Sequence, residues 1–122
     1  HCAESTIYLA PDARKHGLGK RFYRAIEELS LAQNIYNLYA CIGEPQGADD
    51  EYLTDNSIRF HKHMGFRRIG VFTRSGYKFG RWYNMSWAEK LLMEHPEHPE
   101  PVIPFPQLDK VLVADILRRA AE

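Results

Sequence analysis

Residues 7–20 read Ile7-Tyr8-Leu9-Ala10-Pro11-Asp12-Ala13-Arg14-Lys15-His16-Gly17-Leu18-Gly19-Lys20, and this stretch decides how the 122-residue chain folds. Its first half belongs to a β-branched and aromatic run that predicts a strand over residues 5–10, ended by Pro11 and Asp12. Its second half is a basic loop whose glycines lead into a helix. The first N–H groups of a helix lack internal partners and the helix dipole is positive there, so this turn suits an anion. An ordinary helix start has the same pattern, and both interpretations stay open.

Two familiar phosphate-binding loops do not fit this turn. A Walker loop requires Ser or Thr at position 21, which is Arg21. The dinucleotide-binding fingerprint requires a third glycine at position 22, which is Phe22. The pattern that is left is Arg-x-x-Gly-x-Gly, formed by Arg14, Gly17 and Gly19.

The chain after this turn alternates helix-like and strand-like segments. Apolar residues spaced three or four apart from Leu18 to Leu29 predict an amphipathic helix that ends near Asn34. A short helix is predicted over residues 58–64, and Gly65 suits the position just after it. Strands are predicted over residues 37–42, 66–73 and 79–88, with a turn at residues 75–76. This order predicts an α/β fold (α+β in some schemes) whose mixed sheet is flanked by helices and ends in an antiparallel pair.

The C-terminal tail has a different composition. Five prolines fall between residues 96 and 106, which predicts an extended segment on the surface. A terminal helix is predicted after it, over residues 107–121. Its apolar face is predicted to comprise Leu108, Val111, Leu112 and Ile116.

Charge is balanced overall but unevenly placed. Sixteen basic and sixteen acidic side chains cancel, which does not suggest a nucleic-acid-binding coat. Residues 41–57 nevertheless carry five acidic and no basic side chains, whereas residues 58–90 carry eight basic and one acidic. Solvated faces that cancel explain this pattern as well as a functional role does.

Other global signals exclude several classes of protein. A composition with 44% hydrophobic and 26% charged residues is that of an ordinary globular chain. No apolar run approaches the ~20 residues that a membrane span needs, so no membrane partner is expected. Cys2 and Cys41 lack the spacing of a metal site, so no metal is expected and a cytoplasmic location is the default.

Four segments, in order, resemble the GNAT N-acetyltransferases and in particular their phosphinothricin-acetyltransferase-like branch. The Arg-x-x-Gly-x-Gly turn matches the pyrophosphate loop of that superfamily. Residues 4–9 look like the strand before this loop, residues 57–66 like the second helix of the branch, and residues 76–82 like its Gly-Phe-Lys-x-Gly-x-Trp hairpin. The resemblance implies that residues 1–92 are the C-terminal portion of a GNAT domain with its N-terminal strands and helices missing. Residues 93–122 are then a proline-rich extended tail plus a terminal helix.

The resemblance also implies an acetyl-CoA-dependent N-acetyltransferase that acts on a primary amine of a small molecule or an amino acid. Main-chain groups of Ile7, Tyr8 and Leu9 are then expected to pair with the pantetheine arm like an extra strand. The candidate pyrophosphate-binding residues are Arg14, Lys15, His16, Gly17, Leu18, Gly19 and Lys20. Asn56 is a further candidate, out of register with the family's asparagine, whose place Thr54 takes.

Two side chains are candidates for the chemistry. A glutamate at the position of Glu4 is proposed in the family to accept the amine proton, and a carboxylate at a dry acyl site suits that role. His61 stands where many members carry a tyrosine that protonates the thiolate of coenzyme A, and an imidazole can do the same. Each has a plainer interpretation: Glu4 as a surface residue at a strand start, and His61 as a helix residue packed under the cofactor.

Other classes of function stay open. A non-catalytic acyl-CoA-binding module would keep the glycine turn and use neither Glu4 nor His61 chemically. An associating half-domain would cover an exposed sheet edge with a second copy, which predicts a homodimer. The acidic loop over residues 43–52 would favour a cationic acceptor, form a dimer contact, or do neither.

Overall fold

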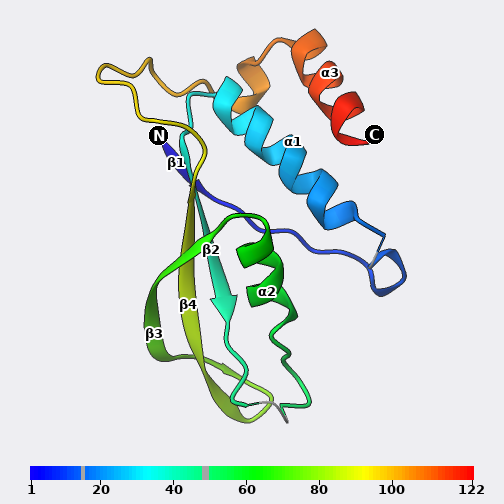
Figure 1. Cartoon of the computed structure of the whole chain (residues 1–122), viewed down its shortest axis with the longest axis vertical. Coiled ribbons are helices and arrows are strands. Elements are labelled where there is room, and N and C mark those ends of the chain that lie inside the picture. Colours follow the sequence, from blue (N-terminus) through cyan, green and yellow to red (C-terminus); the bar gives the residue numbers. More distant parts are fainter. Residues whose placement is uncertain (15, 48–49) are drawn as a thin grey trace. The chain divides into compact units, whose positions relative to one another are not determined.

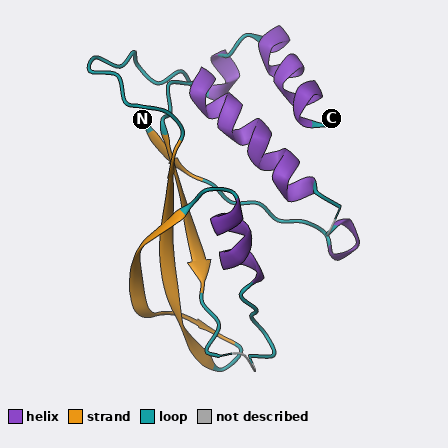
Figure 2. Ribbon diagram, viewed as in Figure 1, coloured by secondary structure: helices purple, strands orange, loops and turns teal. Residues whose placement is uncertain are grey.

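The computed structural model describes residues 1–14, 16–47 and 50–122 (Figure 1). Its elements are, in order, β1 (Cys2–Glu4), η1 (Pro11–Ala13), α1 (Leu18–Ala32), β2 (Asn37–Gly43), α2 (Asn56–His63), β3 (Arg67–Lys78), β4 (Arg81–Leu91), η2 (Phe105–Gln107) and α3 (Lys110–Ala120). The strands form one sheet in the order β1-β2-β4-β3. This is the mixed α/β architecture that the order of segments predicts (Figure 2).

Two compact units make up the described chain. The first contains residues 1–38 and 91–122, and the second contains residues 39–90. No helix within the described ranges is long and apolar enough to cross a membrane.

The first unit is built around α1, against which α3 packs. Its buried apolar residues are Tyr23, Ala25, Ile35, Tyr36, Leu38, Leu108, Ile116 and Ala120. The predicted end of α1 is confirmed, because Asn34 has a φ of 65° just beyond the C-cap residue Gln33.

The tail of the first unit agrees in part with the structure predicted from its sequence. Residues 92–104 form neither helix nor strand, as the prolines predict. The terminal helix is present but begins at Lys110, because Asp109 caps it by accepting a hydrogen bond from the Val111 N–H. Its predicted apolar face is partly wrong: Leu108 and Ile116 are buried, but Val111 is 76% exposed.

The second unit contains a hairpin whose turn lies four residues later than the sequence predicts. β3 runs through residues 75–76 as far as Lys78, and a register shift between Phe72 and Gly76 takes up the irregular segment. The chain reverses at Phe79 and Gly80, which have φ values of 56° and 70°. Two consecutive left-handed residues match the right-handed twist of a two-residue hairpin. The turn prediction at residues 75–76 is therefore wrong, and β4 starts at Arg81.

The strand predicted over residues 5–10 is also wrong in its bounds. β1 covers only Cys2–Glu4, and the chain from residue 5 to residue 10 forms no strand. A strand needs a hydrogen-bonded neighbour, and no described strand pairs along this segment. Its β-branched and aromatic residues favour extended backbone, but they do not provide a neighbour.

Candidate coenzyme and acyl-transfer site

The turn before α1 leaves the first N–H groups of the helix without a side-chain cap. Gly17 is the N-cap residue and has a φ of 76°, a left-handed conformation that other residues rarely adopt. A Cβ added at Gly17 would meet nothing within 4 Å, so conformation rather than space calls for glycine. No acidic residue stands in the first turn. These N–H groups are therefore left for water or for an anion.

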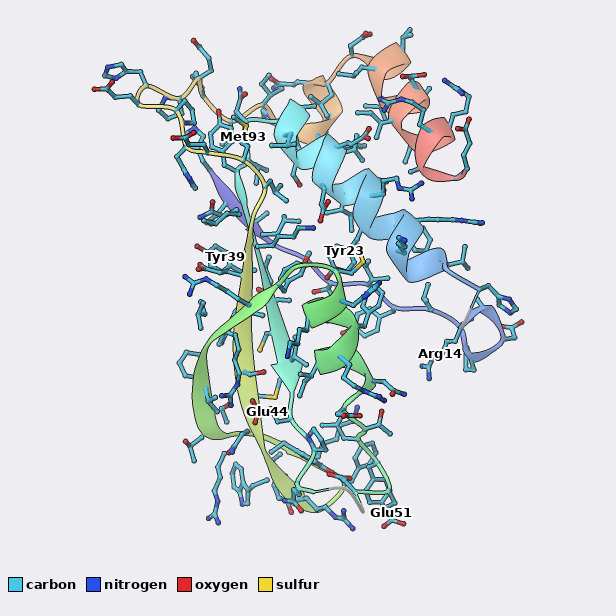
Figure 3. The ribbon with its side chains drawn as sticks, viewed as in Figure 1. Arg14, Tyr23, Tyr39, Glu44, Glu51 and Met93 are labelled. Carbon is cyan, nitrogen blue, oxygen red and sulfur yellow. The ribbon has the colours of Figure 1, made fainter. Side chains whose placement is uncertain are left out.

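Basic side chains surround this helix start. Six residues predicted to bind the pyrophosphate lie in the described part of the chain. Four of them are exposed, namely Arg14, His16, Gly17 and Lys20, while Leu18 is half-buried and Gly19 is buried. Figure 3 shows Arg14 on the loop that precedes α1. Within the described ranges, neither Arg14 nor Lys20 forms an ion pair. Lys15 lies outside the described residues. The turn thus combines open N–H groups with positive charge that no described carboxylate neutralises.

The segment before the turn offers unpaired main chain. Ile7 and Leu9 are half-buried, whereas Tyr8 between them is 91% exposed. No main-chain hydrogen bond joins these three residues to another residue in the described ranges. Main chain that is not hydrogen-bonded within the fold can pair with a strand-like ligand along one edge.

Glu4 is the last residue of β1 and is exposed. The next residue anchors it: Ser5 is buried, and its hydroxyl lies 3.0 Å from the hydroxyl of Tyr23 on α1. Burial raises the pKa of Tyr23 and so favours the protonated hydroxyl further. The contact ties the chain that carries Glu4 to the helix that carries the glycine turn.

His61 lies in the last turn of α2, and its ring is held on one side. Its Nδ1 lies 2.7 Å from the main-chain oxygen of Ser57, and its ring meets Phe66 edge-on at 5.2 Å between centroids. Because a carbonyl only accepts hydrogen bonds, Nδ1 donates, and a neutral His61 ring carries its lone pair on Nε2. The Ser57 carbonyl thus favours the tautomer that carries its proton on Nδ1.

Asn56 is the first residue of α2, and its side chain is already engaged. Its Oδ1 accepts a hydrogen bond from Arg59 at 2.8 Å, while the Thr54 hydroxyl accepts from the Asn56 N–H at 3.3 Å. A groove of about 530 Å³ borders this helix start. Its lining residues are Pro45, Gly47, Asp50, Leu53, Thr54, Asp55, Asn56 and Arg59.

The predicted site residues fall into both units. The first unit brings Glu4, residues 7–9 and the turn before α1 together, whereas Asn56 and His61 belong to the second unit. In the described ranges, no group of three or more His, Cys, Asp or Glu side chains could hold a metal ion.

This arrangement has counterparts among known proteins. Residues 1–87 match the family model described as Acetyltransferase (GNAT) domain. The chain belongs to the GNAT acetyltransferase family. The predicted resemblance to this family, through the phosphinothricin-acetyltransferase-like branch, is thereby confirmed.

Relatives of this GNAT chain are known in sequence and in structure. A phosphinothricin N-acetyltransferase of Streptomyces coelicolor is 34% identical over 89 residues, which cover 73% of the chain and 47% of that protein. A protein of the same name from Streptomyces viridochromogenes is 30% identical over 105 residues, which cover 86% of the chain and 52% of that protein. A GNAT superfamily phosphinothricin acetyltransferase from Sinorhizobium meliloti was solved in complex with AcCoA. It has a TM-score of 0.64 at 26% identity, and the match covers 84% of the chain and 54% of that protein. The chain spans about half the length of these relatives.

Asp50 is a residue of this GNAT chain whose role the sequence did not reveal. Its side chain is 0% exposed, and the two carboxylate oxygens accept hydrogen bonds from the Gln46, Tyr52 and Leu53 N–H groups at 3.0–3.1 Å. The hydroxyl of Tyr83 donates to it at 3.3 Å. Asp50 therefore organises the acidic loop from inside and does not lie open to an acceptor. Asp49 lies outside the described residues.

The surroundings of Asp50 favour its charged form. The hydrogen bond from the Gln46 N–H lowers the pKa of Asp50, and those from Tyr52, Leu53 and Tyr83 add to this against the opposing effect of burial. Burial and the nearby carboxylate both raise the pKa of Tyr83. The signal in the sequence is the acidic run followed by a basic run, which marks charges that meet in the fold.

Proposed function

We propose that the protein is an acetyl-CoA-dependent N-acetyltransferase that acts on a primary amine of a small molecule or an amino acid. The observation that carries this proposal is the uncapped start of α1 at Gly17, with Arg14 and Lys20 beside it outside any described ion pair. Membership of the GNAT family supports it, as do relatives named phosphinothricin N-acetyltransferase.

The first unit is then the coenzyme side of the enzyme. The N–H groups of Leu18, Gly19 and Lys20 bind the pyrophosphate, and Arg14, Lys15 and His16 add charge from the loop. The main chain of Ile7, Tyr8 and Leu9 pairs with the pantetheine arm. Asn56 contributes from α2 once its side chain leaves Arg59. The residues that fit the coenzyme are therefore mainly backbone donors and exposed cations.

Glu4 and His61 carry the proton transfers. Glu4 accepts one proton from the substrate ammonium, and the freed lone pair of nitrogen forms a C–N bond to the acetyl carbon. The C–S bond breaks, its electron pair leaves with sulfur, and protonated His61 delivers a proton to the thiolate from Nε2. The second nitrogen proton goes to solvent, which completes the amide. Nδ1 of His61 stays on the Ser57 carbonyl throughout.

The proposal extends to the setting of the enzyme. We place it in the cytoplasm, in keeping with Cys2 and Cys41, which form no disulfide in the described part of the chain. We also propose a homodimer, because β3 is an edge of the described sheet and exposes large side chains such as Phe72 and Tyr77. Residues 1–92 are proposed as the GNAT portion and residues 93–122 as its tail.

Calorimetric titration with coenzyme A tests the coenzyme site. Arg14→Ala should weaken binding about tenfold, as loss of one charge-assisted hydrogen bond to phosphate does. Arg74→Ala is the matched control, since Arg74 is an exposed arginine of the second unit that also forms no ion pair in the described part of the chain. Pantetheine, which has no phosphate, should bind both variants equally. Unaltered coenzyme affinity in Arg14→Ala would contradict the proposal.

Turnover tests the proposed base. Glu4→Gln keeps the size of the side chain and removes its ability to accept a proton. Coenzyme affinity should stay the same, while acetyl transfer to an accepted amine falls about a hundredfold. Equal turnover in Glu4→Gln and the unaltered protein would remove Glu4 from the mechanism, whereas the non-catalytic acyl-CoA-binding module predicts coenzyme binding without turnover in either protein.

A further inference from the structure

The tail that follows β4 lies beyond the family match yet is held firmly within the first unit. The match ends at residue 87, whereas residues 91–122 share a compact unit with residues 1–38. Three separate sets of contacts connect this tail to α1 and to the chain around β1.

The first set holds the extended, proline-rich part of the tail at the end of α1. The side-chain amide of Gln33 donates to the Ile103 carbonyl at 3.0 Å, and the Gln33 carbonyl accepts from the Ile103 N–H at 3.0 Å. The side-chain amide of Asn34 donates to the Pro101 carbonyl at 3.0 Å. Extended proline-rich backbone has no internal hydrogen bonds, so its carbonyls are open to such donors.

The second set joins the tail to the residue before β1. The His1 Nε2 donates to the Glu100 carbonyl at 2.9 Å, and its ring stacks on Tyr36 at 5.7 Å between centroids. The His95 ring meets the same tyrosine edge-on at 5.9 Å, and the Leu92 N–H donates to the Tyr36 carbonyl at 2.7 Å. The tail is therefore fixed three residues before Glu4.

The third set joins α3 to α1. Ile116 and Ala120 are buried at 3% and 5% exposure. Arg119 forms an ion pair with Glu28 of α1 at 3.1 Å. The neighbouring Arg118 forms ion pairs only within its own C-terminal segment, with Asp115 and Glu122, as far as the described ranges show. Two adjacent arginines thus differ in whether they reach α1.

We propose that residues 92–122 are a strap that positions α1, and with it the candidate pyrophosphate turn, for coenzyme binding. The proposal rests on the proposed function, because α1 begins at that turn. α1 is a continuous helix of 15 residues, so it moves as a rigid body when one end is released. Release at Gln33 or Glu28 therefore displaces the N–H groups at the other end of the helix.

The experiment uses the full chain with single substitutions at two of the contacts between the tail and α1. Arg119→Ala and Gln33→Ala each remove one connection, Arg119→Lys keeps the charge, and Arg118→Ala is the matched control. Amide hydrogen exchange in the first turns of α1 and calorimetric titration with coenzyme A and with pantetheine are measured for each. We expect Arg119→Ala and Gln33→Ala to speed exchange there and to weaken coenzyme A binding about threefold, with Arg118→Ala unchanged and Arg119→Lys close to the unaltered chain.

The two ligands separate positioning from general stability. A strap that positions the pyrophosphate turn affects coenzyme A and leaves pantetheine unchanged, because only coenzyme A carries the phosphates. Equal effects of Arg119→Ala and Arg118→Ala would overturn the strap, and so would equal weakening of both ligands. A chain that binds no coenzyme A would overturn the proposed function, while faster exchange confined to Arg119→Ala and Gln33→Ala would still support the hold on α1.

Discussion

Two charged regions of the molecule, the acidic loop and the basic turn before α1, differ in whether their charged groups are paired. In the acidic loop, the Asp50 carboxylate is buried under main-chain N–H groups, and Arg81 reaches both Asp50 and Glu51 at 3.5 and 3.2 Å. In the turn before α1, Arg14 and Lys20 are exposed and outside any ion pair in the described part of the chain. One region satisfies its charges internally, and the other leaves them for a ligand.

This difference shows what segment charge can and cannot tell. Clusters of like charge in the sequence can form either a closed structural network or an open binding surface. The deciding observation is whether each charged group has a partner, because an ionic group that is satisfied inside the fold has little left to offer a ligand. Five predictions test this division.

Removing the charge of Asp50 should produce the largest effect on stability. Asp50→Asn keeps the shape but sets an amide NH₂ donor against the N–H groups that point at this site, so hydrogen bonds are lost inside the fold. The urea midpoint of unfolding should fall further than it does for substitutions at Gly17, Gly80, Asp55 or Glu51. Asp55→Asn is the control, since Asp55 is an exposed aspartate paired with Arg59. An equal fall in both variants would contradict a special role for Asp50.

The same residue predicts a dependence of stability on pH. The pKa of folded Asp50 is lowered from its ordinary value of 3.8, so its ionised form stabilises the fold above that value. This contribution is lost as the pH falls below 3.8 and through the lower pKa of the folded protein. Stability measured from neutral to acidic pH should therefore decline less steeply in Asp50→Asn than in the unaltered chain. An identical slope would show that other carboxylates dominate acid unfolding.

A pair of glycines should separate structure from binding. Gly17 and Gly80 have φ values of 76° and 70°, and neither would bring a new Cβ within 4 Å of another atom. Alanine at either position should cost about 1 kcal/mol of stability through the left-handed backbone. Only Gly17→Ala should also weaken coenzyme A binding, because it disturbs the N–H groups at the start of α1. Equal coenzyme affinity in the two variants would remove the turn from the binding site.

Salt should affect the two regions differently. Exposed charges are screened within about 10 Å at about 0.1 M salt, whereas buried ones are screened much less. Raising the salt concentration should weaken coenzyme A binding at the turn severalfold in calorimetric titrations. The fall in urea midpoint caused by Asp50→Asn should stay nearly constant over the same range. A salt-insensitive coenzyme affinity would argue against an electrostatic site at Arg14 and Lys20.

Local chemistry made much of the fold predictable. The apolar spacing located α1, the left-handed Asn34 ended it, and β2 matches its predicted residues to within one position. The errors arise where residues outside a segment determine its structure or its burial. Residues 5–10 favour extended backbone but have no neighbouring strand, and Val111 lies on a helix face that the fold leaves exposed.

The candidate site could be predicted only as far as its residue types. The glycine turn could be predicted because the backbone is left-handed at residue 17, and glycine is the residue that adopts this conformation readily. The tautomer of His61 could not be predicted in this way. It depends on the hydrogen bond to the Ser57 carbonyl, a main-chain group that the sequence does not single out. The inward position of Asp50 likewise depends on Tyr83, 33 residues away.

Glu51→Gln should produce the smallest effect and so defines the lower end of the comparison. Glu51 is 63% exposed and meets Arg81 at 3.2 Å, a geometry in which an ion pair contributes about 0–1 kcal/mol. Arg81 keeps its place without this pair, because it also approaches Asp50 and lies over the Tyr52 ring at 4.9 Å. The urea midpoint should therefore change little, although the removed charge is adjacent to Asp50 in sequence and shares its arginine. A loss as large as that of Asp50→Asn would mean that the ion pairs of Arg81, rather than the buried hydrogen bonds of Asp50, hold the acidic loop.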